Sequence, residues 1–295
     1  MSSHTLYVAA AAAPLARRRP LGRGLPREAF VGGGIVFALL AVAVLAPLIS
    51  PHSPTTGAIA QRLWNVGTAG HVLGTDGQGR DILSRLIWGA RPALLGGLTP
   101  VLIAGVIGTV LGTAAGMSRS GPRALIMRVL DVVYAFPAIL LAIAIGAALG
   151  PGLGNSIVSL SVVLIAPVAR VAEGEVLRIR SLDFMDAARA SGAGGWVIGV
   201  RQVLPNIAPA LVVYCTSLVG VAIVYSAGMS FLGLGVVPPA ADWGQMINDL
   251  RQYLYERPAL ALLPAAMIFI ASIGFNLLGD GLKSALSAGR GEVAL

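Results

Sequence analysis

Cysteine and histidine are scarce in this chain of 295 residues, and their scarcity limits the kinds of site it can form. Cys215 is the only cysteine, which excludes an internal disulfide and any metal site built from cysteines of this chain. The three histidines, His4, His52 and His71, are too few and too scattered along the sequence to indicate a metal cluster. We therefore expect no metal on this chain.

Lysine is nearly absent as well. Lys283 is the only lysine and it follows Leu282, so the chain lacks the Gly-Lys-Ser/Thr loop that binds phosphates in ATPases. The apolar stretches also lack the Ser/His or Glu/His pair that a membrane enzyme would need. We expect no catalytic residue and no cofactor on this chain, so any ATP and Mg²⁺ would bind to partner subunits.

Apolar residues dominate the composition. Hydrophobic side chains make up 56% of the chain, charged ones make up 12%, and the mean hydropathy is +0.81. A soluble domain has about 45–50% apolar and about 25% charged residues, and about 20 apolar residues cross a bilayer as a helix. We predict an all-α integral membrane protein with six transmembrane helices, at residues 30–49, 93–116, 126–149, 156–172, 207–229 and 258–279.

The first apolar run, 30–49, follows an arginine-rich stretch, as the core of a cleaved signal peptide does. This run is longer than the roughly 7–15 residues of such a core, which favours an uncleaved first span. Residues 1–29 are then an N-terminal arm, and residues 283–295 are a C-terminal tail.

The net charge of +8 has a simple explanation in such a protein. With both termini cytoplasmic, that side holds 15 of the 21 Lys and Arg residues but only 7 of the 13 acids, when Arg128 and Arg170 at the cytoplasmic ends of their spans are counted with it. An excess of basic residues on one side is what the positive-inside rule describes. We therefore expect lipid around the chain and no nucleic-acid partner.

The outer segments contain two amphipathic patterns. Apolar residues from Ile82 to Ala90 recur at helical spacing within the extracytoplasmic segment 50–92, and a second such pattern follows Asp242, a candidate N-cap. We predict an amphipathic helix at the membrane surface for each. They could form a platform for an external partner, or they could only cover the ends of the spans.

The loop 173–206 holds the most informative polar motif. Asp186-Ala187-Ala188 is followed by Gly192 and then by Leu204-Pro205. Ser181 or Asp183 can cap a short helix that ends near Ala190, Gly192 lets the chain reverse, and Pro205 can open the next span. The small side chains favour close approach of another protein, although a membrane protein can have such a loop without a docking role.

Two features lie within the spans. Ala104, Gly108, Gly112 and Gly116 form a stripe of small residues that permits close helix packing, either within this subunit, which we favour, or against a second subunit.

Asp131 is an unusual carboxylate near the cytoplasmic end of the third span, and it is either a gate residue or, as we favour, the partner of Arg128. Pro137 is expected to kink the same span.

The motif around Asp186 resembles the "EAA" loop of ABC importer permeases, with Asp186 in place of the usual Glu and Gln202 in place of an apolar residue. Other segments resemble the C-type subunit of the dipeptide, oligopeptide and nickel permeases, and the resemblance covers about residues 30–288. These segments are HVLGTD at 71–76 with GRD at 79–81, LSRLI at 83–87 with GAR at 89–91, SFLGLG at 230–235 with PP at 238–239 and WG at 243–244, and FNLLGDGL at 275–282.

The resemblance implies a type I importer fold, the MetI-like fold, with one N-terminal span and a permease core of five spans in 93–282. It also implies a paralogous B-type permease subunit, two ATPase subunits that dock on the loop around Asp186 and Gly192, and an extracytoplasmic solute-binding protein. Peptides would then cross the bacterial inner membrane by alternating access.

The same machinery could instead import nickel, glutathione or heme. An ion-coupled secondary transporter is a further alternative, but it would need relay carboxylates within the spans, and only Asp131 qualifies.

Overall fold

The computed structural model of the chain describes residues 26–68 and 70–290. Within these ranges the protein is built from helices, apart from two isolated β-bridges in the loop before residue 82. Most of the predicted arm 1–29 lies outside the described residues, as do residues 291–295 of the predicted tail. The prediction of an all-α membrane protein is confirmed, with five helices long and apolar enough to cross a membrane, or six if one bent pair is a single span.

α1 (Arg27–Ile49) is the predicted first span. A long loop with the short turn η1 (Ile59–Gln61) then leads to α2 (Ile82–Met117). At about 1.5 Å per residue, the 36 residues of α2 extend about 54 Å, well beyond a hydrocarbon core of about 30 Å.

The separate amphipathic surface helix predicted near Ile82 is wrong, because those residues are the first turns of α2. The helix continues through Pro92 and Pro100 without a break. Its supposed polar face is also not in water, since Ser84 and Arg85 are as deeply buried as Ile82.

The predicted span 126–149 is two helices. α3 (Ser120–Tyr134) and α4 (Ala138–Leu149) meet at an angle of 83° across a three-residue break. Pro137 is the last residue before α4, and a proline at this point ends the hydrogen-bonded ladder of the preceding helix. The kink expected at Pro137 is therefore present, as a sharp bend that separates the helices.

The remaining helices extend beyond their predicted limits. α5 spans Leu153–Ile179, and then α6 (Asp183–Ala190), α7 (Gly195–Ile198) and the π-helical turn η2 (Gly199–Val203) lead into α8 (Leu204–Phe231). After α8 follow α9 (Trp243–Leu250), the short turn η3 (Arg251–Tyr253) and α10 (Pro258–Arg290). The predicted tail thus begins inside α10.

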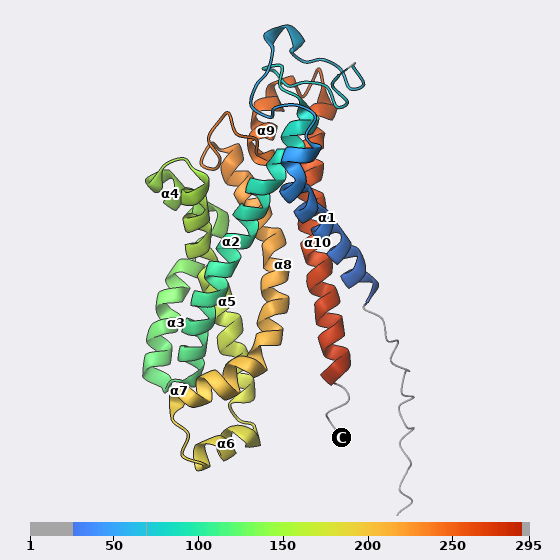
Figure 1. Ribbon diagram of the computed structural model, residues 1–295. Helices are drawn as coiled ribbons and strands as arrows, with labels where there is room; N and C mark the ends of the chain where they lie inside the picture. Colours follow the sequence, from blue (N-terminus) through green and yellow to red (C-terminus); the bar gives the residue numbers. More distant parts are fainter. Residues whose placement is uncertain (1–25, 69, 291–295) are drawn as a thin grey trace, which may run out of the picture.

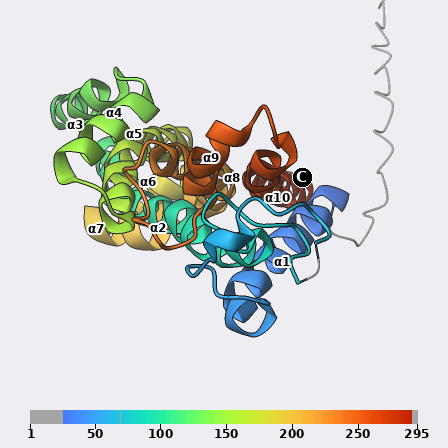
Figure 2. The ribbon, with the colours of Figure 1, turned by 90° about the horizontal axis from the view of Figure 1, so that it is seen from above.

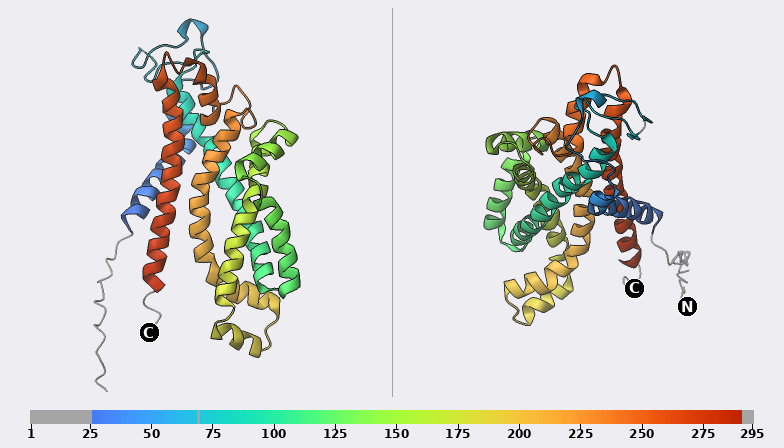
Figure 3. Two further views of the ribbon diagram at one scale, coloured as in Figure 1. Left: turned by 180° about the vertical axis from the view of Figure 1, so that it is seen from behind. Right: turned by 45° about the horizontal axis from the view of Figure 1, so that its top comes forward.

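The long helices run between two ends of the molecule (Figure 1). We call the end with α6 and α7 the α6 end, and the opposite end, with α9 and the loop between α1 and α2, the α9 end. From above, α3 and α4 lie at one side of the bundle and α1 and α10 at the other (Figure 2). Seen from behind, α8 lies between α10 and the α2–α5 pair (Figure 3).

Glycines bring the helices of the bundle into close contact. A β-carbon on Gly32 of α1 would overlap the backbone of Leu278 in α10, and one on Gly281 would overlap Ala29. Gly220 of α8 lies in the same way against Ser272 of α10. Helices in lipid gain little from apolar burial, so such close backbone packing supplies much of their association.

α9 anchors the α9 end to the bundle. Asp242 caps it as predicted, because its carboxylate accepts the Gln245 N–H at 3.0 Å. The Trp243 side chain is fully buried, and its indole N–H donates to the Leu86 carbonyl at 2.9 Å. The second amphipathic helix is therefore present, with its apolar face packed on α2, α8 and α10.

Candidate functional site

The α6–α7 segment (residues 183–198) protrudes at the α6 end (Figure 1). α6 ends in a Schellman turn, in which the Gly192 N–H donates to the Arg189 carbonyl at 3.0 Å and the Ala193 N–H donates to the Ala188 carbonyl at 3.3 Å. Gly192 has a φ of +79°, which strains any residue with a β-carbon. This glycine reverses the chain between α6 and α7.

The start of α6 differs from the prediction. Neither Ser181 nor Asp183 caps it, because the helix begins at Asp183 and the preceding Leu182 makes no side-chain cap. Asp183 and Asp186 lie in the first turn instead, where the partial positive charge of the helix N-terminus stabilises carboxylates.

One side of the α6–α7 segment packs on the bundle. Met185 and Ile198 are buried in a cluster with Val176 of α5, Val203 of η2 and Ile207 of α8. The segment is therefore attached to two of the long helices at once. The turn η2 continues directly into α8, so no loop separates this segment from the start of α8.

The other side of the segment is uncovered. Trp196 is 83% exposed, an unusual position for an indole, and the adjacent Val197 and, just before α6, Leu182 are exposed as well. The Asp186 carboxylate is also exposed and pairs with Arg189 at 2.7 Å. Exposed apolar groups next to charged ones are typical of a protein–protein contact surface.

The remaining residues of the predicted motif lie in different surroundings. Ala187 is exposed, Ala188 is half-buried against the cluster around Met185, and Leu204 packs on the same cluster from the start of α8. Pro205 lies at the second position of α8, directly after the π-helical turn η2, so it stands inside the continuous helix Gly195–Phe231 and does not open the span as expected.

Asp131 does not pair with Arg128. Its carboxylate pairs with Arg170 of α5, and the guanidinium carbon of Arg170 lies 5.1 Å from the centre of the Tyr134 ring. Arg123 and Glu173 form a second α3–α5 pair at 2.6 Å. The predicted pairing with Arg128 is wrong because Asp131 faces the neighbouring helix α5. The spacing of residues along one helix does not show which way that helix faces.

The stripe of small residues on α2 lies against α5. Ala104 is fully buried. A β-carbon on Gly108 would lie 2.8 Å from Val168 Cβ, one on Gly112 would lie 2.6 Å from Ala172 Cβ, and one on Gly116 would lie 2.7 Å from Val176 Cβ. The structure therefore places the stripe in a contact within this subunit.

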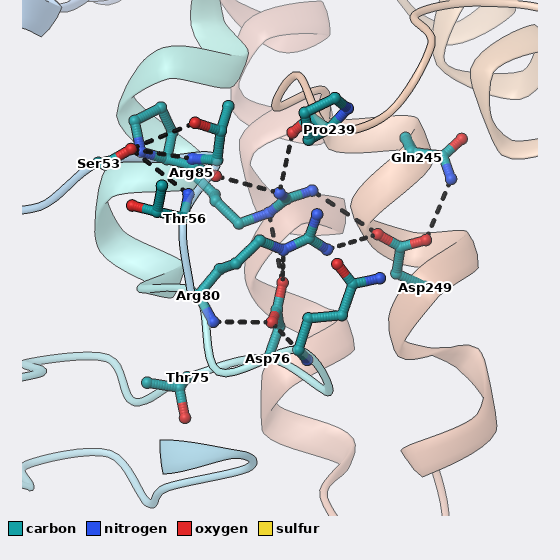
Figure 4. Close-up of polar contacts among 12 residues, drawn as sticks. Ser53, Thr56, Thr75, Asp76, Arg80, Arg85, Pro239, Gln245 and Asp249 are labelled. Carbon is teal, nitrogen blue, oxygen red and sulfur yellow. Dashed lines mark hydrogen bonds and ion pairs between the residues drawn. The ribbon is translucent and has the colours of Figure 1, made fainter. Parts of the chain in front are cut away.

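A buried charge network fixes the α9 end (Figure 4). Asp76 accepts the Arg80 Nε–H at 2.7 Å and lies 3.5 Å from Arg85 Nε. Asp249 of α9 meets the same two guanidiniums, at 3.0 Å and 3.6 Å. Two cations face two anions, so the network is neutral, and it ties the loop before α2 to both α2 and α9.

Two of the histidines, which are far apart in the sequence, meet beside this network. The rings of His52 and His71 stack with centroids 4.6 Å apart, and His71 Nδ1 lies 2.8 Å from Asp81 Oδ1. Burial alone raises the pKa of Asp81, but hydrogen bonds from His71 and Ser84 outweigh it and hold that pKa below its usual range. The expectation that the histidines are too scattered to cluster is wrong for this pair.

Residues 108–290 match the family described as "Binding-protein-dependent transport system inner membrane component". The chain belongs to this family. It is a multi-pass inner-membrane permease subunit of a binding-protein-dependent ABC importer, and it is not catalytic by itself.

Curated relatives match nearly the whole permease. The glutathione transport system permease protein GsiD of Pectobacterium atrosepticum is 39% identical over 88% of this chain and 86% of its own length. GsiD of Escherichia coli O6:K15:H31 is 40% identical over 85% and 83% of the two chains. GsiD of Salmonella typhimurium is 41% identical over 88% and 85%. The predicted resemblance to the C-type peptide permeases is confirmed by these matches.

The fold also matches a solved transporter. Inward-facing MetNI, a methionine ABC transporter, aligns with a TM-score of 0.59 at 22% identity, over 69% of this chain and 97% of the MetNI chain. A second crystal form gives 0.58 at 23% identity. The MetI-like type I importer fold is thereby confirmed.

Three pairs join residues of different elements and were not predicted from the sequence, namely Asp131 with Arg170, Arg80 with Asp249, and His71 with His52. For the pair of Arg80 and Asp249 the sequence gives a weak signal of a charge network, since the stretch from Asp76 to Arg85 is unusually rich in charge for this permease. The motif segments at 71–91 and 230–244 contribute to the α9 end, where they supply Asp76, Arg80 and Arg85 of this network and Trp243 of the core.

Proposed function

We propose that this permease imports glutathione or closely related short peptides. The observation that supports this most is that relatives 39–41% identical, over 85–88% of the chain, are glutathione permeases by name. Glutathione is itself a tripeptide derivative, so the proposal agrees with the peptide substrate expected from the motifs. Di- and oligopeptides remain the second candidate, because those motifs resemble dipeptide and oligopeptide permeases as well.

A cavity of about 330 Å³ between α3, α4, α5 and α8 is consistent with a path that releases peptides readily. Its lining is mostly apolar, with Tyr134 and Tyr225 as the only residues among those lining it that have a side-chain hydroxyl group. Weak, adaptable contacts favour release, whereas selective recognition would take place on the binding protein.

The substrate is tested by uptake in a host strain from which the transporter genes have been deleted. Complementation should restore uptake of labelled glutathione, and an excess of unlabelled glutathione should compete better than an unlabelled dipeptide. Uptake of the dipeptide alone would transfer the assignment to di- or oligopeptides, and uptake of nickel alone would contradict both peptide assignments.

We also propose that the α6 end is cytoplasmic and that ATPase subunits dock on the α6–α7 segment. The exposed side chains of Trp196 and Asp186 support this, as does the direct connection of the segment to α8. ATP and Mg²⁺ would be held by these ATPases. For transport, the ATP-loaded ATPases must bind one conformation of the permease more tightly than the other, because only differential affinity shifts an equilibrium.

A second, B-type permease subunit would complete the translocation path, and a solute-binding protein would dock at the α9 end. The apolar surfaces of α3, α4 and α8 that this subunit leaves exposed are available for a partner helix or lipid. Co-purification of these partners with the tagged permease tests the assembly directly.

A further inference from the structure

Three potential metal ligands meet at the α9 end, outside the residues proposed to couple transport to ATP. They are His52, just beyond the end of α1, His71 in the loop, and Asp81 at the start of α2. One ligand atom from each lies within 4.8 Å of the others. Such a cluster is notable here because the whole chain has only three histidines.

The carboxylate of Asp81 is held in a defined orientation. Its Oδ2 accepts the Ser84 N–H at 2.8 Å and the Ser84 hydroxyl at 2.7 Å, as the cap of α2. Its other oxygen, Oδ1, therefore points at the two imidazoles. The same Ser84 hydroxyl accepts the His52 backbone N–H at 3.0 Å, so one serine positions two of the three residues.

The side chains of His71 and His52 differ in how tightly the surrounding residues hold them. The His71 side chain is buried and the Trp64 ring packs against it edge-on, with centroids 5.7 Å apart. The His52 side chain is 42% exposed. A site built from these groups thus has two fixed ligands, one adjustable ligand and a side open to solvent.

Both distances to the Asp81 carboxylate can be compared with those of a tetrahedral site. Ligands about 2.0–2.1 Å from a tetrahedral ion lie about 3.4 Å from one another. His71 Nδ1 lies 2.8 Å from Asp81 Oδ1, and His52 Nδ1 lies 3.9 Å from the same oxygen. One distance is shorter and one longer than the ideal by roughly half an ångström, and the exposed His52 ring would have to turn out of its stack on His71 to direct its nitrogen at an ion.

The donor set selects the ion. Two imidazole nitrogens and one carboxylate oxygen suit zinc and its neighbours, whereas Mg²⁺ and Ca²⁺ prefer sites made of oxygen. Three protein ligands with a fourth position open to water is also a common zinc arrangement. We propose that His52, His71 and Asp81 form a binding site for one divalent cation of the zinc type.

The ion would join three segments that are separate in the chain. It connects the residues after α1, the loop, and the first turn of α2, next to the charge network of Asp76 and Arg80. Its role is a structural clip on the face proposed for the binding protein, and this goes beyond the proposed function. When the ion binds, His71 coordinates through Nδ1 and its ring proton moves to Nε2, so the hydrogen bond to Asp81 is replaced by two coordinate bonds.

The test compares zinc binding by matched variants of the full chain, purified without a histidine tag and together with its co-expressed partner subunits. After treatment with a chelator, zinc is titrated calorimetrically and counted by mass spectrometry. His52→Phe keeps a ring to stack on His71 but has no ligand atom, and it should bind one zinc ion fewer per permease. In wild type, Zn²⁺ should raise the Tm more than in this variant, and Mg²⁺ should not raise it in either.

His52→Gln is the second variant and should bind the same zinc ion at least about tenfold more weakly than wild type. His4→Gln is the control, because it removes one histidine but leaves His52, His71 and Asp81 in place, and it should behave as wild type. Equal zinc content and an equal Zn²⁺-induced rise of the Tm in wild type and both His52 variants would overturn the proposal. Glutathione uptake does not enter this readout, so the proposed function and the metal site can fail independently.

Discussion

A β-carbon on Gly112 would overlap the Ala169 carbonyl oxygen and lie 2.6 Å from Ala172 Cβ, so α2 and α5 can pack only if this position has no side chain. Gly112→Val should therefore force the two helices apart. Overpacking of this kind costs about 1–3 kcal/mol or more, because backbone cannot move aside as a flexible side chain does. We expect a clearly lower Tm of the detergent-solubilised permease, measured by loss of the monodisperse species on heating.

Gly34→Val is the matched control. Gly34 also lies in the middle of a long helix, so the cost of placing valine in a helix is the same, but a β-carbon there has no neighbour within 4 Å. A Tm as low for Gly34→Val as for Gly112→Val would show that helix propensity, and not the contact with α5, explains the loss.

Single positions also show where sequence reasoning reaches its limit. The small-residue stripe could be predicted because small side chains at helical spacing permit close helix packing. The turn at Gly192 could be predicted because glycine readily adopts a positive φ. The partner of Asp131 could not, because Arg170 lies 39 residues away and the choice depends on how α3 and α5 are placed. Asp81 and its two histidines escaped prediction for the same reason.

At the scale of elements, the α6–α7 segment combines an outer surface with an inner attachment to α5 and α8. Gly192 keeps the two short helices at a fixed angle through its Schellman turn. Gly192→Val should abolish uptake of the transported substrate while the permease still inserts into the membrane, because a β-branched residue resists a φ of +79° at a cost of about 1–2 kcal/mol. Uptake and stimulation of ATPase activity by substrate-loaded binding protein are the measurements.

Two further variants separate backbone strain from bulk at this turn. Gly192→Asn should retain more activity, because asparagine tolerates this conformation, and Gly194→Val should be mild, since Gly194 has a φ of −67° and free space around it. Equal activity of Gly192→Val and wild type would contradict the coupling role of this turn.

The existence of the helices was predicted better from the sequence than their ends and breaks. Each long apolar run is helical, one of them as the α3–α4 pair, because about 20 apolar residues that cross a lipid bilayer must satisfy their backbone hydrogen bonds within the segment. The predicted ends of the helices were wrong where buried polar residues lengthen a helix beyond its apolar run. At the start of α2, for example, the helix begins at Ile82 and not at residue 93. The break between α3 and α4 was underestimated, since a proline predicts a kink but its angle depends on the neighbouring helices.

At the scale of the whole molecule, the arrangement of passes agrees with the charge distribution. α1, α2, the α3–α4 pair, α5, α8 and α10 alternate in direction, so the beginning of α1 and the end of α10 point to the α6 end (Figure 1). The α6 end also has Arg119, Arg178 and Arg201 on its exposed surface. The alternation places the beginning of α1 and the end of α10 toward the same end as α6, and since basic residues are retained on the cytoplasmic side, the charge favours a cytoplasmic α6 end.

This orientation predicts opposite labelling of two positions in a Cys215→Ser background. Arg119→Cys, between α2 and α3 at the α6 end, should react with a membrane-impermeant maleimide only after the cells are opened. Tyr255→Cys, where the side chain is fully exposed at the α9 end, should react in intact spheroplasts. The background variant alone should remain unlabelled in both states. Labelling of position 119 from outside, with protection of position 255, would invert the topology and with it the assignment of the α6–α7 segment to the ATPases.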